Sequence, residues 1–205
     1  MKIAVLEMGL LPPTLAERHG GFFELIRTWL LGHAQAGVDL KFSQFVVCDG
    51  GVLPEPSDFD AYVISGSKHS VYEDLPWIQD TKVFLNRLAD LHIPMFGICF
   101  GHQLMAFGGK VEKSNKGWGI GTDVYQFANR TQEVLVVHQD QVTVLPTSVQ
   151  VQAQSAHCDY GVLQYDFPAC SAQFHKEYTQ ELVLDLLVRG RGDFGEEVAA
   201  GAEQK

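Results

Sequence analysis

The chain has 205 residues, of which 46% are hydrophobic and 20% are charged, as in an ordinary soluble globular protein. Its formal net charge of −10 disfavours binding to nucleic acid or to an anionic membrane, because both require a basic surface. No apolar run approaches the ~18 residues of a membrane span, and the apolar run at the start of the chain is too short for a signal peptide.

Strand-like and helix-like segments alternate in the first half of the sequence. Apolar runs predict strands at 2–7, 40–47, 61–64 and 93–98. Apolar residues at helical spacing predict helices at 18–35 and 77–91, with a loop at Pro12-Pro13 before the first. This alternation of strand and helix predicts a mostly parallel sheet with helices on both faces.

The second half favours extended structure. We expect strands near Val111 and at 120–127, 132–137, 141–145, 149–154, 161–165 and 170–174. The glycines at 117–121 lie between strand-like segments, which indicates a turn or hairpin and not a phosphate loop. A last helix is expected at about 177–189, and the acidic residues 191–205 predict a flexible tail. With no repeat or linker, residues 1–190 are expected to form one domain.

Cys99 lies where the fourth predicted strand ends and a helix-compatible run at 103–107 follows. The segment Gly97–Gln103 reads Gly-Ile-Cys-Phe-Gly-His-Gln, and its glycines allow a sharp turn and close approach of neighbouring elements. A thiol at a helix N-terminus is favoured as the nucleophilic thiolate. The other cysteines show no CxxC pairing and are interpreted as small buried side chains in a cytoplasmic protein with reduced thiols: Cys48, Cys158 and Cys170.

Two further segments carry the groups that a cysteine nucleophile requires. His175 and Glu177 are two residues apart, so in an extended segment they project on the same side, as a base and the carboxylate that orients it. Gly66 follows a predicted strand and can present its N–H to an oxyanion, with the Phe100 N–H as a second donor. All these residues follow carboxyl ends of predicted strands, where open α/β sheets place their sites.

With these motifs, the sequence resembles the class-I glutamine amidotransferases. Order and spacing agree over roughly residues 40–190, and the segment 137–142, which reads Val-His-Gln-Asp-Gln-Val, looks like the glutamine-pocket segment of GMP-synthetase-like amidotransferase domains. The resemblance implies a flavodoxin-like α/β fold, with an open, mostly parallel sheet and extra antiparallel strands in the second half. It also implies hydrolysis of a γ-glutamyl amide through a thioester.

The resemblance assigns a role to each residue of the site. Cys99 corresponds to the nucleophile, His175 to the general base and acid, and Glu177 to the group that orients His175. The oxyanion donors correspond to Gly66 and Phe100, and the substrate-binding side chains to Gln103 and His138. The resemblance implies no metal and no organic cofactor. His102 lies three residues after Cys99 in the segment 97–103, which we call the elbow, and is interpreted as a packing or capping residue.

Two motifs depart from the family pattern. The usual His-Pro-Glu reads His-Lys-Glu at 175–177, which keeps both functional side chains. The usual Gly-Gly-Pro of the oxyanion loop reads Gly-Ser-Lys at 66–68, and Ser67 adopts positive φ less readily than glycine.

Three functions remain open from the sequence. The first is a glutaminase. Because no synthetase domain follows in this sequence, we expect it to supply ammonia to a separate synthetase or acceptor subunit, or to act alone on glutamine. Alternatively the protein is a γ-glutamyl peptidase or hydrolase that acts on a larger conjugate, or a non-catalytic subunit or sensor that binds a ligand.

Overall fold

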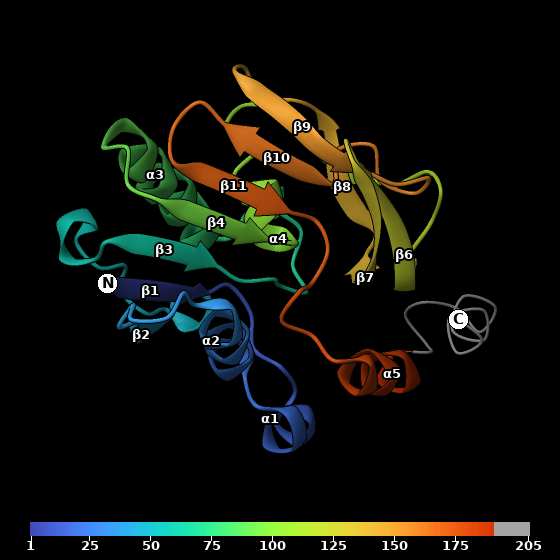
Figure 1. The fold of residues 1–205 in the computed structure, drawn as a ribbon, viewed down its shortest axis with the longest axis horizontal. Coiled ribbons are helices and arrows are strands. Elements are labelled where there is room, and N and C mark those ends of the chain that lie inside the picture. The colour runs from blue at the N-terminus through green and yellow to red at the C-terminus, as the bar shows by residue number, and fades with distance from the viewer. Residues whose placement is uncertain (191–205) are drawn as a thin grey trace.

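Short apolar runs form a parallel sheet in the computed structural model, which describes residues 1–190 (Figure 1). Its five parallel strands have the order β2-β1-β3-β4-β11. They are β1 (Lys2–Glu7), β2 (Lys41–Val46), β3 (Ala61–Ile64), β4 (Met95–Ile98) and β11 (Ala169–Ala172). Because the five strands are parallel, the carboxyl ends of β3, β4 and β11 meet at one edge of the sheet.

Antiparallel strands from the second half of the chain continue the same sheet, as predicted. Beyond β11 the order is β10-β9-β6-β7, which gives nine strands in all. These strands are β6 (Gly119–Phe127), β7 (Arg130–His138), β9 (Val149–Gln154) and β10 (Val162–Tyr165), while β5 (Lys110–Lys113) and β8 (Asp140–Val144) form a separate antiparallel pair. The prediction of a turn over 117–121 is wrong in part: Gly117 has a φ of 81° in a turn, but β6 begins at Gly119.

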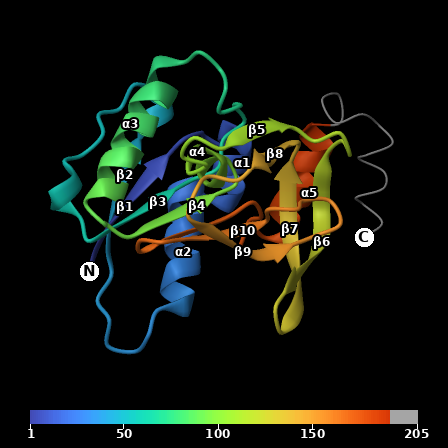
Figure 2. The ribbon, with the colours of Figure 1, turned by 90° about the horizontal axis from the view of Figure 1, so that it is seen from above.

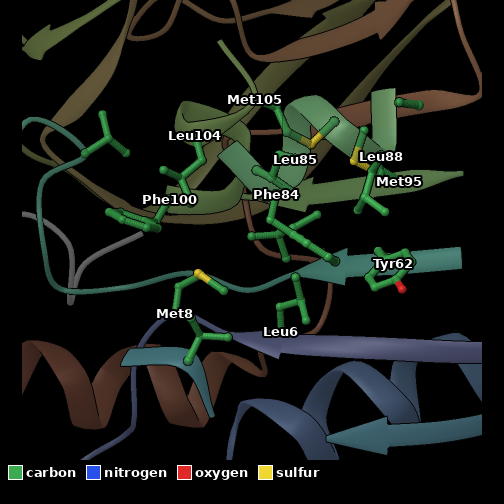
Figure 3. Close-up of a cluster of buried hydrophobic side chains, with 14 of the residues drawn as sticks. Leu6, Met8, Tyr62, Phe84, Leu85, Leu88, Met95, Phe100, Leu104 and Met105 are labelled. Carbon is green, nitrogen blue, oxygen red and sulfur yellow. The ribbon is translucent and has the colours of Figure 1, made fainter. Parts of the chain in front are cut away.

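Helices cover both faces of the parallel strands, and Figure 2 shows α2 (Phe22–His33) and α3 (Pro76–Asp90) on opposite sides of them. The side chains of β1 alternate between two cores, as the two-residue period of a strand requires. Ala4 and Leu6 face the core of α3 (Pro76–Asp90) and α4 (Phe100–Leu104), shown in Figure 3. Ile3 and Val5 face the core of α1 (Pro13–His19), α2 and α5 (Gln180–Arg189). This packing explains why β1 is apolar throughout.

The predicted helix at 18–35 is two helices, α1 (Pro13–His19) and α2 (Phe22–His33). Gly20 ends α1 with a φ of 84°, which breaks the helical path before α2 begins. Pro13 also proves to be the first residue of α1 and not part of a loop, because its fixed φ suits the first helical position and its missing N–H is not needed there.

Two other helix boundaries differ from the prediction. The helix after Cys99 begins at Phe100, three residues earlier than expected, and ends at Leu104. The last helix, α5 (Gln180–Arg189), begins three residues later, because the Thr179 hydroxyl accepts the Leu182 N–H and caps it. No helix within residues 1–190 is long and apolar enough to cross a membrane. The predicted tail at 191–205 lies outside the described residues.

Candidate active site

Cys99 forms a strained turn between β4 and α4. Its φ is 51° and its ψ is −101°, a conformation that non-glycine residues rarely adopt and that is held by the surrounding structure. The Cys99 N–H donates to the Ala172 carbonyl at 2.8 Å, and the Gly101 N–H donates to the Ser65 carbonyl at 3.2 Å. The turn is therefore fastened to the ends of both neighbouring strands, β11 and β3.

The glycines beside Cys99 serve close packing and not the turn itself. A Cβ on Gly97 would lie 2.6 Å from the Gly101 carbonyl oxygen, and a Cβ on Gly101 would lie 2.4 Å from the Ile64 carbonyl oxygen. Neither glycine has a positive φ, whereas Cys99 does. The sequence correctly indicated close approach, but the sharp bend falls on the cysteine.

His175 and Glu177 form a buried pair directly after β11. The His175 Nδ1 lies 2.7 Å from the Glu177 Oε1, and their side chains are only 2% and 1% exposed. The His175 N–H donates to the Leu135 carbonyl of β7 at 2.8 Å, which anchors this segment to that strand. The two side chains thus contact each other, but the backbone bends at residues 176 and 177, so the pair does not lie on the extended segment that the sequence predicted.

The electrostatic surroundings of His175 favour its protonated form. Burial by itself lowers the pKa of an imidazole, because it disfavours the charged state. The Glu177 carboxylate and the Cys99 side chain outweigh that effect and raise the pKa of His175 to about 10. The site therefore favours an imidazolium next to the cysteine sulfur.

Gly66, Cys99 and His175 converge on one small volume. A Cβ placed on Gly66 would lie 3.1 Å from the His175 Cε1 and 3.7 Å from the Cys99 Cβ. These residues follow β3, β4 and β11, three adjacent strands of the parallel sheet. The structure thus brings together the three segments that were predicted to meet at the carboxyl edge.

Two backbone amides lie beside the cysteine. Phe100 is the first residue of α4, where an α-helix leaves its N–H groups without an intrahelical acceptor. Within residues 1–190, no protein acceptor bonds the Phe100 or the Gly66 N–H. Ser67 is not among the residues with positive φ, so the loop after Gly66 takes a conformation that serine adopts easily.

A small polar network supports the loop after Gly66. The Glu73 carboxylate accepts the Ser70 N–H at 2.6 Å and lies 2.9 Å from the His69 Nδ1. The His69 ring contacts Trp77 edge to face, and Trp77 packs against Phe100. The network therefore connects the loop to the residue that follows the cysteine. No sequence motif points to Glu73, and the helical spacing of apolar residues in 77–91 indicates only a packing position for Trp77.

The two predicted substrate-binding side chains both contact the backbone just after β7. The Cys99 sulfur is 3.9 Å from the Val137 carbonyl oxygen, at the end of β7. Gln103 is buried and donates to the Asp140 carbonyl at 2.8 Å, and the His138 Nδ1 lies 3.2 Å from the same oxygen. Burial, followed by the nearby His157, lowers the pKa of His138 to about 3, so its ring is neutral. Both side chains are thus bonded to the segment whose Val137 carbonyl contacts the Cys99 sulfur.

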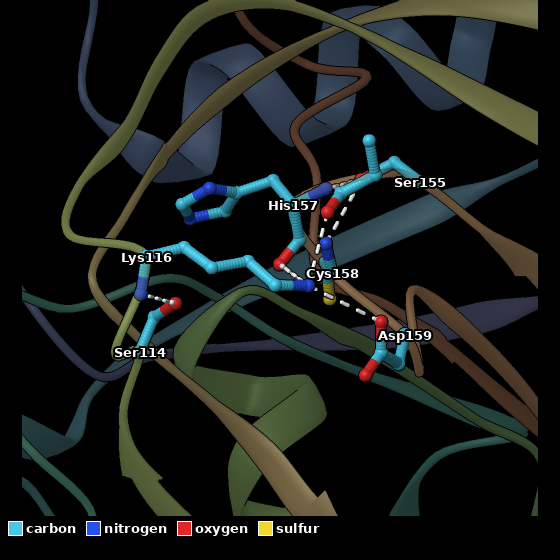
Figure 4. Close-up of polar contacts among 7 residues, drawn as sticks. Ser114, Lys116, Ser155, His157, Cys158 and Asp159 are labelled. Carbon is cyan, nitrogen blue, oxygen red and sulfur yellow. Dashed lines mark hydrogen bonds and ion pairs between the residues drawn. The ribbon is translucent and has the colours of Figure 1, made fainter.

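The other cysteines lie apart from this arrangement. Cys158 is fully buried in the loop that Ser155 and Lys116 brace, shown in Figure 4. Burial raises the pKa of its thiol to about 12, which makes it unreactive. Burial also raises the pKa values of Cys48 and Cys170. All four cysteines are free thiols.

His102 has a packing position, as its sequence context indicates. Its ring is fully buried beneath the elbow, with Nδ1 2.8 Å from the Ser171 hydroxyl. In the described part of the chain, no group of three histidine, cysteine or acidic side chains is arranged to hold a metal ion.

Comparison with known proteins places the chain in a family. Residues 35–183 match the family model described as glutamine amidotransferase class-I. The chain belongs to the class-I glutamine amidotransferase family. Its fold agrees with the crystal structure of a glutamine amidotransferase from Thermotoga maritima, with a TM-score of 0.75 at 17% identity over 100% of this chain and 90% of that one. The central sheet and its helices are those of a flavodoxin-like amidotransferase.

Curated relatives of this chain carry two kinds of name. Gamma-glutamyl peptidase 4 of Arabidopsis thaliana is 31% identical over 73% of the chain and 66% of its own length, and gamma-glutamyl peptidase 2 is 30% identical over 84% and 74%. GMP synthase of Desulfotalea psychrophila is 35% identical over 61% of the chain and 26% of its own length. The chain thus spans about two thirds of the first peptidase and about a quarter of the synthase.

Proposed function

We propose that the protein hydrolyses a γ-glutamyl amide bond, with Cys99 as nucleophile, His175 as general base and acid, and Glu177 as the group that orients His175. The convergence of Gly66, Cys99 and His175 carries this proposal, because a thiol, an imidazole and a backbone amide then lie close together. Membership of the amidotransferase family supports it.

In the first half of the proposed reaction, the Cys99 thiolate attacks the γ-carbonyl carbon. The carbonyl oxygen becomes an oxyanion, which the N–H groups of Gly66 and Phe100 stabilise, each contributing ~10²–10³-fold in rate. The His175 imidazolium then gives its proton to the departing amine. The carbon–nitrogen bond breaks, and a glutamyl thioester remains on the sulfur.

In the second half, the neutral His175 takes a proton from water, whose oxygen attacks the thioester carbon. The carbon–sulfur bond breaks and releases glutamate and the Cys99 thiolate, which restores the starting state. General acid–base catalysis of this kind contributes ~10²–10⁴-fold. Glu177 keeps the His175 Nδ1 protonated and the ring oriented through their 2.7 Å contact.

The leaving group divides the proposal into two substrate classes. With glutamine the leaving group is ammonia, and a separate synthetase subunit is then a candidate acceptor, as the resemblance to GMP synthases suggests. With a γ-glutamyl peptide or conjugate the leaving group is a larger amine. The peptidase relatives favour the second class, because their alignments cover 73–84% of this chain, whereas the alignment with the synthase covers 61%.

The test is to label the protein with a glutamine-like diazoketone and map the modified residue by mass spectrometry. We expect label on Cys99, protection by excess substrate, and loss of labelling in His175→Ala. Turnover of glutamine and of a γ-glutamyl dipeptide, measured side by side as glutamate release, then separates the two substrate classes. A protein that is neither labelled nor active on either substrate would contradict the proposal and favour a ligand-binding subunit.

A further inference from the structure

The ring of Tyr178 lies face to face with the His175 imidazole. The two ring centroids are 3.8 Å apart and the planes differ by 9°. Phe22, the first residue of α2, lies parallel to the same tyrosine ring, with a centroid distance of 6.3 Å. Tyr178 is thus held between the site and the helix that packs beneath the sheet. The position of Tyr178 is further fixed by the next residue, Thr179, which caps α5 at its first residue, Gln180.

We propose that Tyr178 is a positioning residue that acts through His175, with its ring face holding the imidazole in place and stabilising its protonated form. The inference rests on the proposed function, since it concerns the same acid and base. An aromatic face attracts a cation that lies over it, and this attraction is strongest where water is excluded. The His175 side chain is 2% exposed, so its stacked face meets that condition.

The groups around His175 leave the tyrosine a distinct role. Glu177 faces the Nδ1 edge from the same segment, Cys99 interacts from the elbow, and His138 lies nearby at the end of β7. Burial, followed by His157 and to a lesser extent by His175 itself, lowers the pKa of His138, so the His138 ring is neutral and places no charge beside His175. Tyr178 instead covers the face of the His175 ring, on which none of these three residues stacks.

The tyrosine itself remains neutral while His175 titrates. Burial, followed by the negative charges of Glu177 and Cys99, raises the pKa of Tyr178 well above its ordinary value. A change in the high-pH behaviour of the site therefore reports on the imidazolium and not on a phenolate. This separation makes the inference measurable.

The experiment follows alkylation of Cys99 by iodoacetamide between pH 5 and pH 11. Peptide mass spectrometry separates Cys99 from the other three cysteines. A cysteine paired with an imidazolium gives two inflections: a lower one when the thiolate forms and an upper one when the imidazolium loses its proton. We expect Tyr178→Leu to move the upper inflection to lower pH by ~0.5–1 unit. The lower inflection should stay in place.

Tyr178→Phe is the matched control, because it keeps the ring face and removes only the hydroxyl. We expect it to keep the wild-type upper inflection. Tyr178→Met, which retains volume without a ring, should behave as the leucine variant does and provides a second test if that variant does not fold. An upper inflection that is the same in the leucine, methionine and wild-type proteins overturns the inference, as does a phenylalanine variant that shifts as far as the leucine one.

Alkylation needs no turnover, so the inference and the proposed function fail separately. An inactive protein with a ring-dependent upper inflection supports the inference while contradicting the hydrolase. An active protein whose upper inflection ignores the ring supports the hydrolase and overturns the inference.

Discussion

The Gly101 backbone packs directly on the Ile64 carbonyl oxygen, so that a Cβ on Gly101 would lie 2.4 Å from it. This contact joins the helix after the cysteine to the strand that leads to the oxyanion loop, and the Gly101 N–H donates to the adjacent Ser65 carbonyl. Both partners are backbone, so a larger residue cannot be accommodated by a change of rotamer. The close approach thus fixes Cys99 relative to the loop at Gly66.

Gly101→Ala should destabilise the protein and displace the elbow. We expect a loss of roughly 3 kcal/mol in the free energy of unfolding, as in overpacked cores, together with lost Cys99 labelling. Gly32→Ala is the control, since a Cβ there meets nothing within 4 Å in the exposed part of α2. It should stabilise the helix by about 0.5–1 kcal/mol. Urea titration measures both, and equal stabilities of the two variants would contradict the packing argument.

Gly66→Ala should reduce activity far more than stability. The added methyl would lie 3.1 Å from the His175 Cε1 and 3.7 Å from the Cys99 Cβ. We expect kcat/KM to fall by at least ~10²-fold, the value of one oxyanion donor, with a small change in melting temperature. Steady-state kinetics on a γ-glutamyl substrate and a thermal melt are sufficient. Full activity in this variant would contradict the prediction, because it would mean that the substrate does not bind next to Gly66.

Glu73→Gln should loosen the oxyanion loop. The Ser70 N–H and then the His69 side chain lower the pKa of the Glu73 carboxyl, so these bonds favour the charged form. The Glu73 carboxylate therefore supports the loop fully above the ordinary carboxyl pKa, and this support is lost as the pH falls through the lowered pKa of Glu73. We expect ~10-fold lower kcat/KM at neutral pH, since bonds to a charged group are worth ~1.5–3 kcal/mol.

The control for that prediction is Glu112→Gln, on β5. Its carboxylate also accepts side-chain hydrogen bonds, from Lys110 and Thr143, but it lies on the separate two-stranded sheet. Activity should be unchanged in this variant. If both glutamine variants lose activity equally, the effect reflects surface charge and not the loop.

Glu177→Gln should shift the high-pH limb of the reaction. Glu177 is the main group that raises the pKa of His175 against the effect of burial, so the neutral amide lowers it. The imidazolium is then lost at lower pH, and the high-pH limb of kcat/KM moves to lower pH. The rate should fall by ~10²-fold or more, because the acid that protonates the leaving amine is depleted. Glu181→Gln, exposed in the first turn of α5, should leave the profile unchanged.

The sequence predicted the fold and the convergence of the site for a physical reason: both depend on local patterns. Apolar runs mark the strands, and parallel strands place their carboxyl ends at one edge, so Gly66, Cys99 and His175 had to approach one another. Tyr178 and Glu73 could not be found in this way. Their roles depend on a ring stack and on a carboxylate that turns back into its own loop, neither of which leaves a periodic signal.

The helix boundaries likewise depend on tertiary contacts and backbone geometry that a sequence pattern does not reveal. The break at Gly20 follows from one residue in a left-handed conformation within an apolar run that is otherwise helical, and propensity alone does not reveal which glycine breaks a helix. The start of α4 at Phe100 follows from the bend at Cys99, which the surrounding backbone bonds impose.

His102 predicts how stability depends on pH. Burial lowers the pKa of this imidazole to about 3, from an ordinary value of 6.5, so the folded protein holds it neutral. Between those values the unfolded chain binds a proton that the folded chain does not. The contribution is therefore fully present above pH 6.5 and is lost as pH falls, by ~1.4 kcal/mol per pH unit.

His102→Asn removes this titration, and the amide can still bond the Ser171 hydroxyl that His102 contacts at 2.8 Å. The variant should be less stable than wild type at pH 7.5, because a buried ring is lost, but its unfolding free energy should fall less between pH 7.5 and pH 5. We expect a difference in slope equivalent to roughly 2 kcal/mol at pH 5. Urea unfolding at several pH values measures it. Parallel curves would mean that the imidazole is protonated within the fold, which its contact with the Ser171 hydroxyl and its complete burial make costly.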